Sequence, residues 1–401
     1  MSDLPDGWEF SPLGEVVHVL DGRRIPVNAT ERASRPGPVP YYGAAGQVGW
    51  IDEALFDEPL VLLGEDGVQF LDRGKPKAYS ITGPAWVNNH AHVLRTRDGV
   101  LNQRFLVHYL NWIDYSGLAN GTTRLKLTQA AMRRIVVRLP PCDEQQRIVD
   151  VLEGHLSCLD AARDYLRAAQ RRTASMQATA LGDLVASARR EGVPSVLGAV
   201  ARWGSGGTPK SGDPRYYSDG SIPWAVIGDL TDGPVTLTAT SITPAGLAES
   251  AAKIVPANSV LIAMYGSIGK LGLPAVPMAT NQAIAFAMPH SEIERDFLFW
   301  YLRAERPSLI AAGRGGTQKN ISQTILKSWP IFVPPVEVQR RLTSRMQALH
   351  ERSVQLQVAT SRVLLQERGL RRALLDAAFS GRLTRHSPSS GVVDVAAEMA
   401  P

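Results

Sequence analysis

The sequence predicts an α+β protein built as a tandem repeat, in which two compact α+β domains are each followed by a long α-helix. Three observations predict this arrangement. The segment "LPPCDEQQRIVDVLE" (139–153) returns 194 residues later as "VPPVEVQRRLTSRMQ" (333–347). A long heptad pattern of apolar residues follows each copy. The stretches before each copy are rich in glycine, proline and short β-branched runs, which is typical of strands joined by tight turns.

The repeat extends beyond these two segments. From residue 121 onward, residue n aligns with residue n+194 without gaps. The halves also begin alike, since 12–22 resembles 196–206, and "NNHA" (88–91) resembles "TNQA" (280–283). The offset varies inside the halves and is fixed at their ends, which indicates a duplication with divergent interiors. The identical pairs are Gly121 and Gly315, Thr123 and Thr317, Gln129 and Gln323, Pro140 and Pro334, Pro141 and Pro335, Gln145 and Gln339, and Arg147 and Arg341.

The two helices are expected at 140–183 and 334–384. Proline suits a first helical turn, and Gly182 and Gly381 are expected to end the helices. Neither helix could bury its apolar stripe alone, so we expect the two to pair; the alternative is that each packs on its own domain as an ordinary amphipathic helix. Thr173, Ser353, Thr360 and Glu367 are poor residues for such a seam. The predicted pairing residues are Ile148, Leu152, Leu159, Leu166 and Met176 in the first helix, and Leu342, Met346, Leu349, Leu356, Val363, Leu370 and Leu374 in the second.

The domains are expected at 1–139 and 184–333, with a frayed tail at 385–401. Strands ended by glycine turns are predicted within 58–67 and 258–269, and another strand within 328–333. The stretches 102–113 and 294–304 predict one equivalent helix in each half. Tyr41, Tyr42, Trp224 and Trp300 are interpreted as core aromatics.

Composition excludes several protein classes. The chain has 401 residues, of which 44% are hydrophobic and 20% charged, as in ordinary globular domains. Neither a run of about 20 apolar residues nor a signal peptide is visible, so we expect a cytoplasmic protein. Cys142 and Cys158 lie in one predicted helix and form neither a disulfide framework nor a zinc spacing. The net charge is +5, but its surplus lies in 336–385, which holds ten arginines and four acidic residues; charge alone therefore does not establish nucleic-acid binding.

Motifs of catalysis are missing from the pattern. "YGSIGKL" (265–271) departs from a phosphate-binding loop, because Met264 and Leu271 stand where glycine and a hydroxyl residue are required. "GDPRYY" (212–217) has Arg215 in place of the second proline of an amino-methyltransferase motif. His90 and His92 flank Ala91 and are interpreted as packed or hydrogen-bonded side chains. No serine-nucleophile elbow or metal-ligand spacing occurs. These features favour a binding or organising protein over an enzyme.

Several segments together resemble the specificity subunit of type I restriction–modification systems. They are "LPDGWEFSPLGEV", "PYYGAAGQVGWID", "LLGEDG" and "VNNHAHVL", then "GGTPKSGDPRYY", "IPWAVIGDL", "YGSIGKLGL", "ATNQA", "GGTQKNIS" and both "PP…Q.R" helix starts. Their order and duplication, over nearly the whole chain, carry the resemblance. It implies that each half is an α+β target-recognition domain and that the helices are spacers paired as an antiparallel coiled coil. Val338 departs from the first copy, which has Glu144.

The resemblance also implies partners. The subunit would have no catalysis and no cofactor of its own. It would bind double-stranded DNA and two modification subunits, which methylate adenine with S-adenosylmethionine; two restriction subunits, which use ATP and Mg, can join. Two domains held apart by a helical rod would read two short sequences separated by unread base pairs. The open alternatives are a coiled-coil scaffold that does not bind DNA, and a self-contained methyltransferase.

Candidate DNA contacts are side chains with paired donors and acceptors for bases, and cations or hydroxyls for phosphates. A plain surface or turn role stays open for each of them. The candidates are Arg23, Arg24, Lys75, Lys77, Arg124 and Lys126 in the first domain, and Thr208, Lys210, Arg215, Tyr265, Ser267, Lys270, Arg314, Gln318 and Lys319 in the second.

Overall fold

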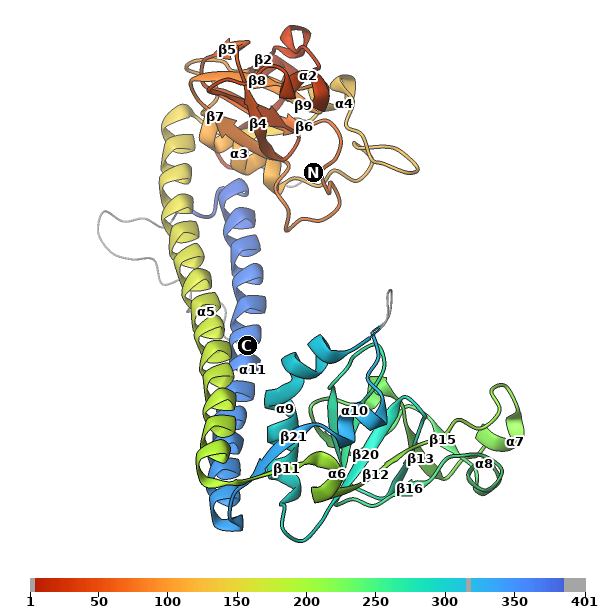
Figure 1. Ribbon diagram of the computed structural model, residues 1–401. Coiled ribbons are helices and arrows are strands. Elements are labelled where there is room, and N and C mark those ends of the chain that lie inside the picture. Colours follow the sequence, from red (N-terminus) through yellow and green to blue (C-terminus); the bar gives the residue numbers. More distant parts are fainter. Residues whose placement is uncertain (1–3, 315–318, 386–401) are drawn as a thin grey trace. The chain divides into compact units, whose positions relative to one another are not determined.

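The computed structural model describes residues 4–314 and 319–385 (Figure 1). The chain divides into two compact units, one formed by 1–166 with 361–401 and the other by 167–360. Each unit contains one α+β domain and a segment of both long helices. In the part of the chain that the structure describes, no helix is long and apolar enough to cross a membrane. Gln318 and the predicted tail beyond Arg385 lie outside the described residues.

The domain of the first unit has two four-stranded sheets, with strand orders β2-β9-β6-β7 and β4-β3-β8-β5, and a two-stranded ribbon of β1 and β10. β6 is buried along its whole length, as expected for a central strand. The elements are β1 (Glu9–Pro12), α1 (Leu13–Val16), β2 (Val17–Val19), η1 (Asp21–Arg23), α2 (Ala29–Ala33), β3 (Val39–Gly43), β4 (Gly46–Ile51), β5 (Phe56–Asp57), β6 (Leu60–Gly64), β7 (Ala78–Ile81), β8 (Pro84–Val87), β9 (Ala91–Thr96), α3 (Gln103–Trp112), α4 (Gln129–Arg133) and β10 (Val136–Leu139).

The domain of the second unit has sheets with strand orders β12-β20-β17-β18-β14 and β15-β13-β19-β16, and a ribbon of β11 and β21. The elements are β11 (Val193–Val196), α6 (Leu197–Val200), β12 (Ala201–Ser205), α7 (Pro214–Tyr217), β13 (Ile222–Ala225), η2 (Ile227–Asp229), β14 (Gly233–Val235), β15 (Ser241–Ile242), α8 (Pro244–Ala248), β16 (Ile254–Val255), β17 (Val260–Ala263), β18 (Leu271–Pro274), β19 (Met278–Thr280), β20 (Ile284–Pro289), α9 (Arg295–Ala312), α10 (Gln323–Lys327) and β21 (Pro330–Val333).

The two domains share one strand arrangement. The order β2-β9-β6-β7 recurs as β12-β20-β17-β18, and the parallel pair of β3 with β8 recurs as β13 with β19. The predicted equivalent helices are α3 and α9, and each packs into the main core of its unit. Tyr41, Trp224 and Trp300 are buried and Tyr42 is half-buried. The α+β class and the internal duplication are thereby confirmed.

The long helices are α5 (Cys142–Glu191) and α11 (Val336–Phe379). The predicted end of the first helix near residue 183 is wrong, because the helix continues through Gly182, where a side chain would meet open space. The helix ends at Glu191, just before Gly192, where a Cβ atom would approach the Pro334 nitrogen to 2.7 Å. Gly381 has a φ of +72° just after α11, as a C-terminal cap requires. Cys142 and Cys158 are free and exposed in α5.

Within each unit the two helix segments run antiparallel and pack on each other. In the first unit Asp160 pairs with Arg371. In the second, Gln170 donates to Thr360 at 2.8 Å and Glu191 pairs with Arg341. The paired residues move in opposite directions along the two helices, which confirms an antiparallel pair. Of the predicted pairing residues, Ile148, Leu152, Leu342, Met346 and Leu374 are buried, and Leu159, Leu166, Leu349 and Leu370 are half-buried.

Three predicted pairing residues are exposed instead. Met176 is 61% exposed, Val363 43% and Leu356 36%. A strict heptad stripe drifts by about 20° per heptad on a straight helix, so the buried face of α5 passes over Gln177 instead of Met176 and continues through Ala180, Leu184 and Ala188. The apolar pattern therefore identified the correct helices but placed the seam incorrectly near their middle.

Two polar residues that look unsuitable for the seam are nevertheless buried in it. Thr360 is 2% exposed and accepts the hydrogen bond from Gln170, while its own hydroxyl donates to the Leu356 carbonyl at 2.8 Å. Glu367 is 9% exposed and pairs with Arg371 at 3.2 Å. Buried polar groups with satisfied partners favour one register of a helix pair over others.

Candidate nucleic-acid interface

Each domain places two loops side by side at the end of its central strand. In the first domain the loop after β6 contacts the loop 120–127 through a β-bridge of Asp66 with Lys126, and a second β-bridge, of Asn120 with Lys126, closes the loop 120–127 itself. In the second domain Asn320 makes the same bridges to Tyr265 and Arg314. We call residues 65–67 with 120–127 the first loop site. Residues 265–270 with 314 and 319–321 form the second loop site.

The two loop sites are built alike at their base. The Leu127 amide donates to the Glu65 carbonyl at 2.8 Å, and the Ile321 amide donates to the Met264 carbonyl at 2.9 Å. Leu127 and Ile321 are separated by the repeat distance of 194 residues. The tight turn at Gly121 has a φ of +150°, and a Cβ atom there would lie 2.1 Å from the Arg124 carbonyl oxygen. The repeated loop therefore brings equivalent segments of both domains to equivalent places.

The first loop site gathers two of the predicted cations. The Arg124 guanidinium lies 3.0 Å from an Asp66 carboxylate oxygen, and the Lys126 ammonium lies 2.9 Å from Glu65. Their side chains are 62% and 53% exposed, respectively. His90 also contacts Asp66, at 2.8 Å. The carboxylates thus hold both cations in defined positions at the surface, and the ion pair with Glu65 raises the pKa of Lys126.

The other four first-domain candidates do not lie with Arg124 and Lys126 at the surface of the first loop site. Lys77 is only 1% exposed, and its ammonium donates to the carbonyl oxygens of Asp72 and Lys75; burial lowers its pKa. Arg24 points inward, where it pairs with Glu65 and donates to the Ala91 carbonyl. Lys77 and Arg24 are therefore corrected to internal structural residues.

Two first-domain candidates remain at the surface. Arg23 is exposed but pairs with Glu58 and lies over the Phe56 ring. Lys75 is exposed in the segment between β6 and β7. Neither is among the residues of the first loop site.

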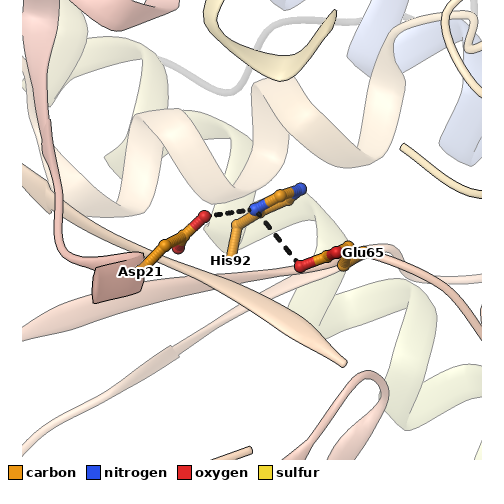
Figure 2. A group of neighbouring side chains, drawn as sticks. All are labelled: Asp21, Glu65 and His92. Atoms are coloured by element: carbon orange, nitrogen blue, oxygen red, sulfur yellow. Dashed lines mark hydrogen bonds and ion pairs between the residues drawn. The ribbon is translucent and has the colours of Figure 1, made fainter. Parts of the chain in front are cut away.

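A buried charged cluster lies beneath the first loop site (Figure 2). His92 Nδ1 lies 2.7 Å from Asp21 and 3.8 Å from Glu65, and His92 Nε2 lies 2.8 Å from the Leu127 carbonyl oxygen. Burial alone would raise the pKa of Asp21, but its hydrogen bonds with His92 and the Val93 amide hold that pKa below its usual value. Glu65 behaves likewise: burial would raise its pKa, and hydrogen bonds from Arg24 and Lys126 lower it.

The cluster has the residue types of a metal site but not a free donor set. Ligand atoms of Asp21, Glu65 and His92 lie within 4.8 Å of one another. A metal-bound imidazole must offer one ring nitrogen as a lone pair. Both ring nitrogens of His92 are already engaged within the protein, Nδ1 with the Asp21 carboxylate and Nε2 with the Leu127 carbonyl oxygen. The arrangement is that of a hydrogen-bonding centre.

The second loop site contains a concave pocket. Ser267, Lys270 and Lys319 line it together with Arg306, Asp232 and Ile310, and its volume is about 560 Å³. Arg306 forms a hydrogen-bonded ion pair with Asp232. Burial alone would raise the pKa of Asp232, but this ion pair holds that pKa below its usual value. Lys319 is exposed, and the Lys270 ammonium donates to the Ile227 carbonyl at 3.2 Å.

The remaining second-domain candidates occupy two places. Tyr265 and Arg314 are exposed in the second loop site, where both are bridged to Asn320. Thr208, Lys210 and Arg215 belong to another segment, 208–215. In it, Thr208 donates to Gln282 and Arg215 pairs with Asp213 at 3.0 Å.

Sequence reasoning missed several residues of these sites. Asn320 could have been found from the repeat, since it stands 194 residues after Lys126. Asp21 and His92 are 71 residues apart and no motif links them, and Arg306 lies within α9. The interpretation of His92 as a packed, hydrogen-bonded side chain is confirmed, but that Asp21, His92 and Arg306 belong to these sites required the tertiary structure.

Chemically, both loop sites present groups that suit nucleic acid. Exposed Lys and Arg side chains can neutralise phosphates. Hydroxyl, amide and guanidinium groups with paired donors and acceptors can contact base edges. The presence of one such site in each half gives the chain two separate surfaces of the same kind.

The chain is similar to known proteins of one family. The family model of the type I restriction modification DNA specificity domain matches twice, at residues 5–164 and 193–363. A type I restriction enzyme specificity subunit of Haemophilus influenzae is 36% identical over 149 residues, which are 36% of this chain and 37% of that protein. The EcoR124I/EcoR124II specificity subunit of Escherichia coli is 30% identical over 152 residues, 36% of this chain and 38% of that protein. The matched stretches thus span less than two fifths of these relatives.

Solved structures show the same fold. A chain from a study of complex assembly and conformational transition of the type I R-M system superimposes with a TM-score of 0.70 at 20% identity, covering 95% of this chain and all of that one. The HsdS subunit from Thermoanaerobacter tengcongensis has a TM-score of 0.52 at 19% identity, covering 95% of this chain and 98% of that chain.

Proposed function

The chain belongs to the type I restriction modification DNA specificity family, and on this premise we propose that it is a non-catalytic subunit that reads a bipartite DNA target. Each domain reads one half-site through its loop site, and the base pairs between the half-sites are not read. The observation that carries this proposal is the recurrence of one loop construction, with Lys126 bridged in the first half and Asn320 in the second.

The divergence of the two loop sites fits two different half-sites. The first presents Arg124 and Lys126, each held by a carboxylate. The second presents Ser267, Lys270 and Lys319 around a pocket. The bases of the loops are alike and the exposed groups differ, as expected when the frame is kept while the sequence that is read changes.

The chemistry of the proposed complex belongs to partners. Two modification subunits methylate adenine with S-adenosylmethionine, and two restriction subunits, which use ATP and Mg, can join for cleavage. The chain directs them by binding DNA and by offering its helix pair, α5 and α11, as the shared structural element. This division of roles is consistent with the hydrogen-bonding character of the Asp21, Glu65 and His92 cluster.

The proposal is tested by co-expressing the full chain with the modification subunit of its system and mapping methylated adenines by long-read sequencing. We expect one split motif with a fixed gap. A continuous motif, or methylation that does not depend on this chain, would contradict the proposal. Unaltered association of the proteins without any methylated motif would favour the coiled-coil scaffold. Binding of S-adenosylmethionine by the chain alone would favour a self-contained methyltransferase.

A further inference from the structure

The loop of the first loop site is fixed at one residue from both sides. The Leu127 amide donates to the Glu65 carbonyl at 2.8 Å, and the Leu127 carbonyl accepts from His92 Nε2 at 2.8 Å. Above this residue, Asn120 and Lys126 close the loop with two backbone hydrogen bonds of 3.0 and 2.9 Å. Both polar backbone groups of Leu127 are therefore determined by neighbours outside the loop.

The same cluster holds the chain on either side of Leu127. The Glu65 carboxylate forms an ion pair with the Lys126 ammonium at 2.9 Å, and the Asp21 carboxylate accepts a hydrogen bond from Gln129 Nε2 at 3.0 Å. Asp21 and Glu65 are joined through His92, which is 1% exposed, and Arg24 contacts both carboxylates. One buried network thus contacts residues 126, 127 and 129 (Figure 2 shows its centre).

Among the described residues of the second half, the equivalent positions do not repeat this network. The pair of Val17 on β2 with Thr96 on β9 is equivalent to the pair of Ala201 on β12 with Pro289 on β20. Counting along the chain from these pairs, Asp21 corresponds to Ser205 and His92 corresponds to Ala285. Glu65, which accepts from the Leu127 amide, corresponds to Met264, which accepts from the Ile321 amide. The second loop is thus anchored over small and apolar side chains where the first is anchored over three ionisable ones. The duplicated frame supports its two loops in physically different ways.

We propose that His92 is a positioning residue that fixes the first loop, 120–127, in its DNA-reading conformation. It acts by holding the Leu127 carbonyl while its other ring nitrogen is held by Asp21. The expected effect of His92 on DNA recognition rests on the proposed function. The expected order of the loop in the free protein does not depend on that function. A loop ordered before binding has less conformational entropy to lose when Arg124 and Lys126 meet DNA.

The test uses the full chain with His92→Phe, which keeps a ring and removes both hydrogen bonds. Asp21→Asn, which keeps the shape but removes the charge and replaces one acceptor oxygen by a donor NH2 group, guards against failure to fold. His18→Phe is the matched control, because His18 is an exposed histidine on β2, the strand next to β9. Amide hydrogen exchange is measured without DNA at Asn120, Lys126 and Leu127. Discrimination against duplexes with one scrambled half-site is measured in the complex with the modification subunit.

We expect exchange at these three amides to speed up by roughly tenfold in His92→Phe and by less in Asp21→Asn, with amides of α3 and of the second unit unchanged. Discrimination should fall by about five- to tenfold at one half-site only, since the loop must then be ordered on binding. Unchanged exchange in both variants would overturn the positioning role even if DNA is read. Faster exchange with discrimination intact at both half-sites would overturn its link to recognition. If zinc ions slow the exchange of the unaltered protein, the cluster is a metal site and the proposal is wrong. A wild-type chain that reads no sequence would refute the proposed function, while the exchange experiment would still decide the positioning role.

Discussion

Gln145 and Gln339, which stand 194 residues apart, are both fully buried and make the same three hydrogen bonds. Gln145 Nε2 donates to the carbonyls of Pro140 and Val100 at 2.8 and 2.9 Å, and its Oε1 accepts from the Asn102 amide at 2.7 Å. Gln339 does the same with Pro334, Glu292 and Glu294, at 2.8, 2.9 and 2.8 Å. Each glutamine therefore ties the first turn of a long helix to the loop before α3 or α9 of its own domain, and the repeated proline–glutamine motif is the joint between them.

Replacing a joint glutamine should loosen one domain on its helix. Gln145→Ala removes three hydrogen bonds and leaves buried carbonyls unpaired, so we expect the first unit to lose about 2–3 kcal/mol of unfolding free energy. Gln339→Ala should affect the second unit alike. Gln146→Ala, at the exposed neighbouring position, should change little. Urea-dependent amide exchange of α3 and α9 measures each unit separately, and equal effects of Gln145→Ala and Gln146→Ala would contradict the assignment.

The cations of the loop sites should govern the salt dependence of DNA binding. Lys319→Ala and Lys126→Ala should each weaken binding and reduce the slope of log affinity against log salt by about 1, because each phosphate contact releases roughly one counterion. Lys77→Met is expected to leave the slope unchanged, since Lys77 is buried. Lys253→Ala, at an exposed position outside the loop sites, is the surface control. Titration of a fluorescent duplex at several salt concentrations supplies the slopes; a slope that responds equally to Lys253 would argue against the assigned surface.

The length of the helix pair should set the gap in the DNA target. Inserting seven residues into α5 and seven into α11 keeps the antiparallel seam in register and lengthens each helix by about 10 Å. If the pair acts as a ruler, the unread gap should grow by about three base pairs, given the rise of 3.4 Å per base pair. Methylation mapping reads the gap directly. Insertion into α5 alone is the control and should disrupt pairing; a gap that stays constant in the doubly lengthened protein would refute the ruler.

His108 should make the first unit sensitive to mild acid. Burial, with Arg104 and Arg371 nearby, lowers the pKa of His108 to about 4, and its Nε2 lies 3.0 Å from Glu153. The unfolded chain takes up this proton at about pH 6.5 and the folded chain only near pH 4. Stability is therefore complete above pH 6.5 and falls as the pH drops towards 4, by at most about 3 kcal/mol.

The variant His108→Gln tests this dependence. It keeps a donor for Glu153 and cannot titrate, so the loss of unfolding free energy of the first unit between pH 6.5 and 4 should shrink relative to the unaltered protein. His18→Gln, at an exposed position, should leave that dependence as it is. Amide exchange of α3 as a function of pH provides the measurement. Identical pH profiles for His108→Gln and the unaltered chain would show that another group is responsible.

The predictable and unpredictable parts of the fold follow from how local their causes are. The heptad stripe, the two prolines and the repeated glutamine are readable in sequence, and they predicted two long paired helices. The seam near Met176 was placed incorrectly, because small differences between 3.5- and 3.6-residue periods accumulate along a helix. The helix end was misplaced for a different reason: glycine often ends helices, but nothing around Gly182 requires the helix to end there.

The site was less predictable than the fold. Arg124, Lys126, Ser267, Lys270 and Lys319 were named from sequence and do gather in the two loop sites. Lys77 was named by the same reasoning and is buried, because a sequence does not show whether a cation can find backbone carbonyls inside the fold. Exposure is a property of the packed domain.

The sequence by itself determined the duplication, the two long helices and the joints that attach them, because each depends on residue spacing along one continuous segment. Only the tertiary structure decided that Asp21, Glu65 and His92 meet under the first loop while Ser205, Met264 and Ala285 take their places in the second half. Those contacts join residues up to 71 positions apart. They depend on which strands pair and in which register, which the separate sequence segments do not specify.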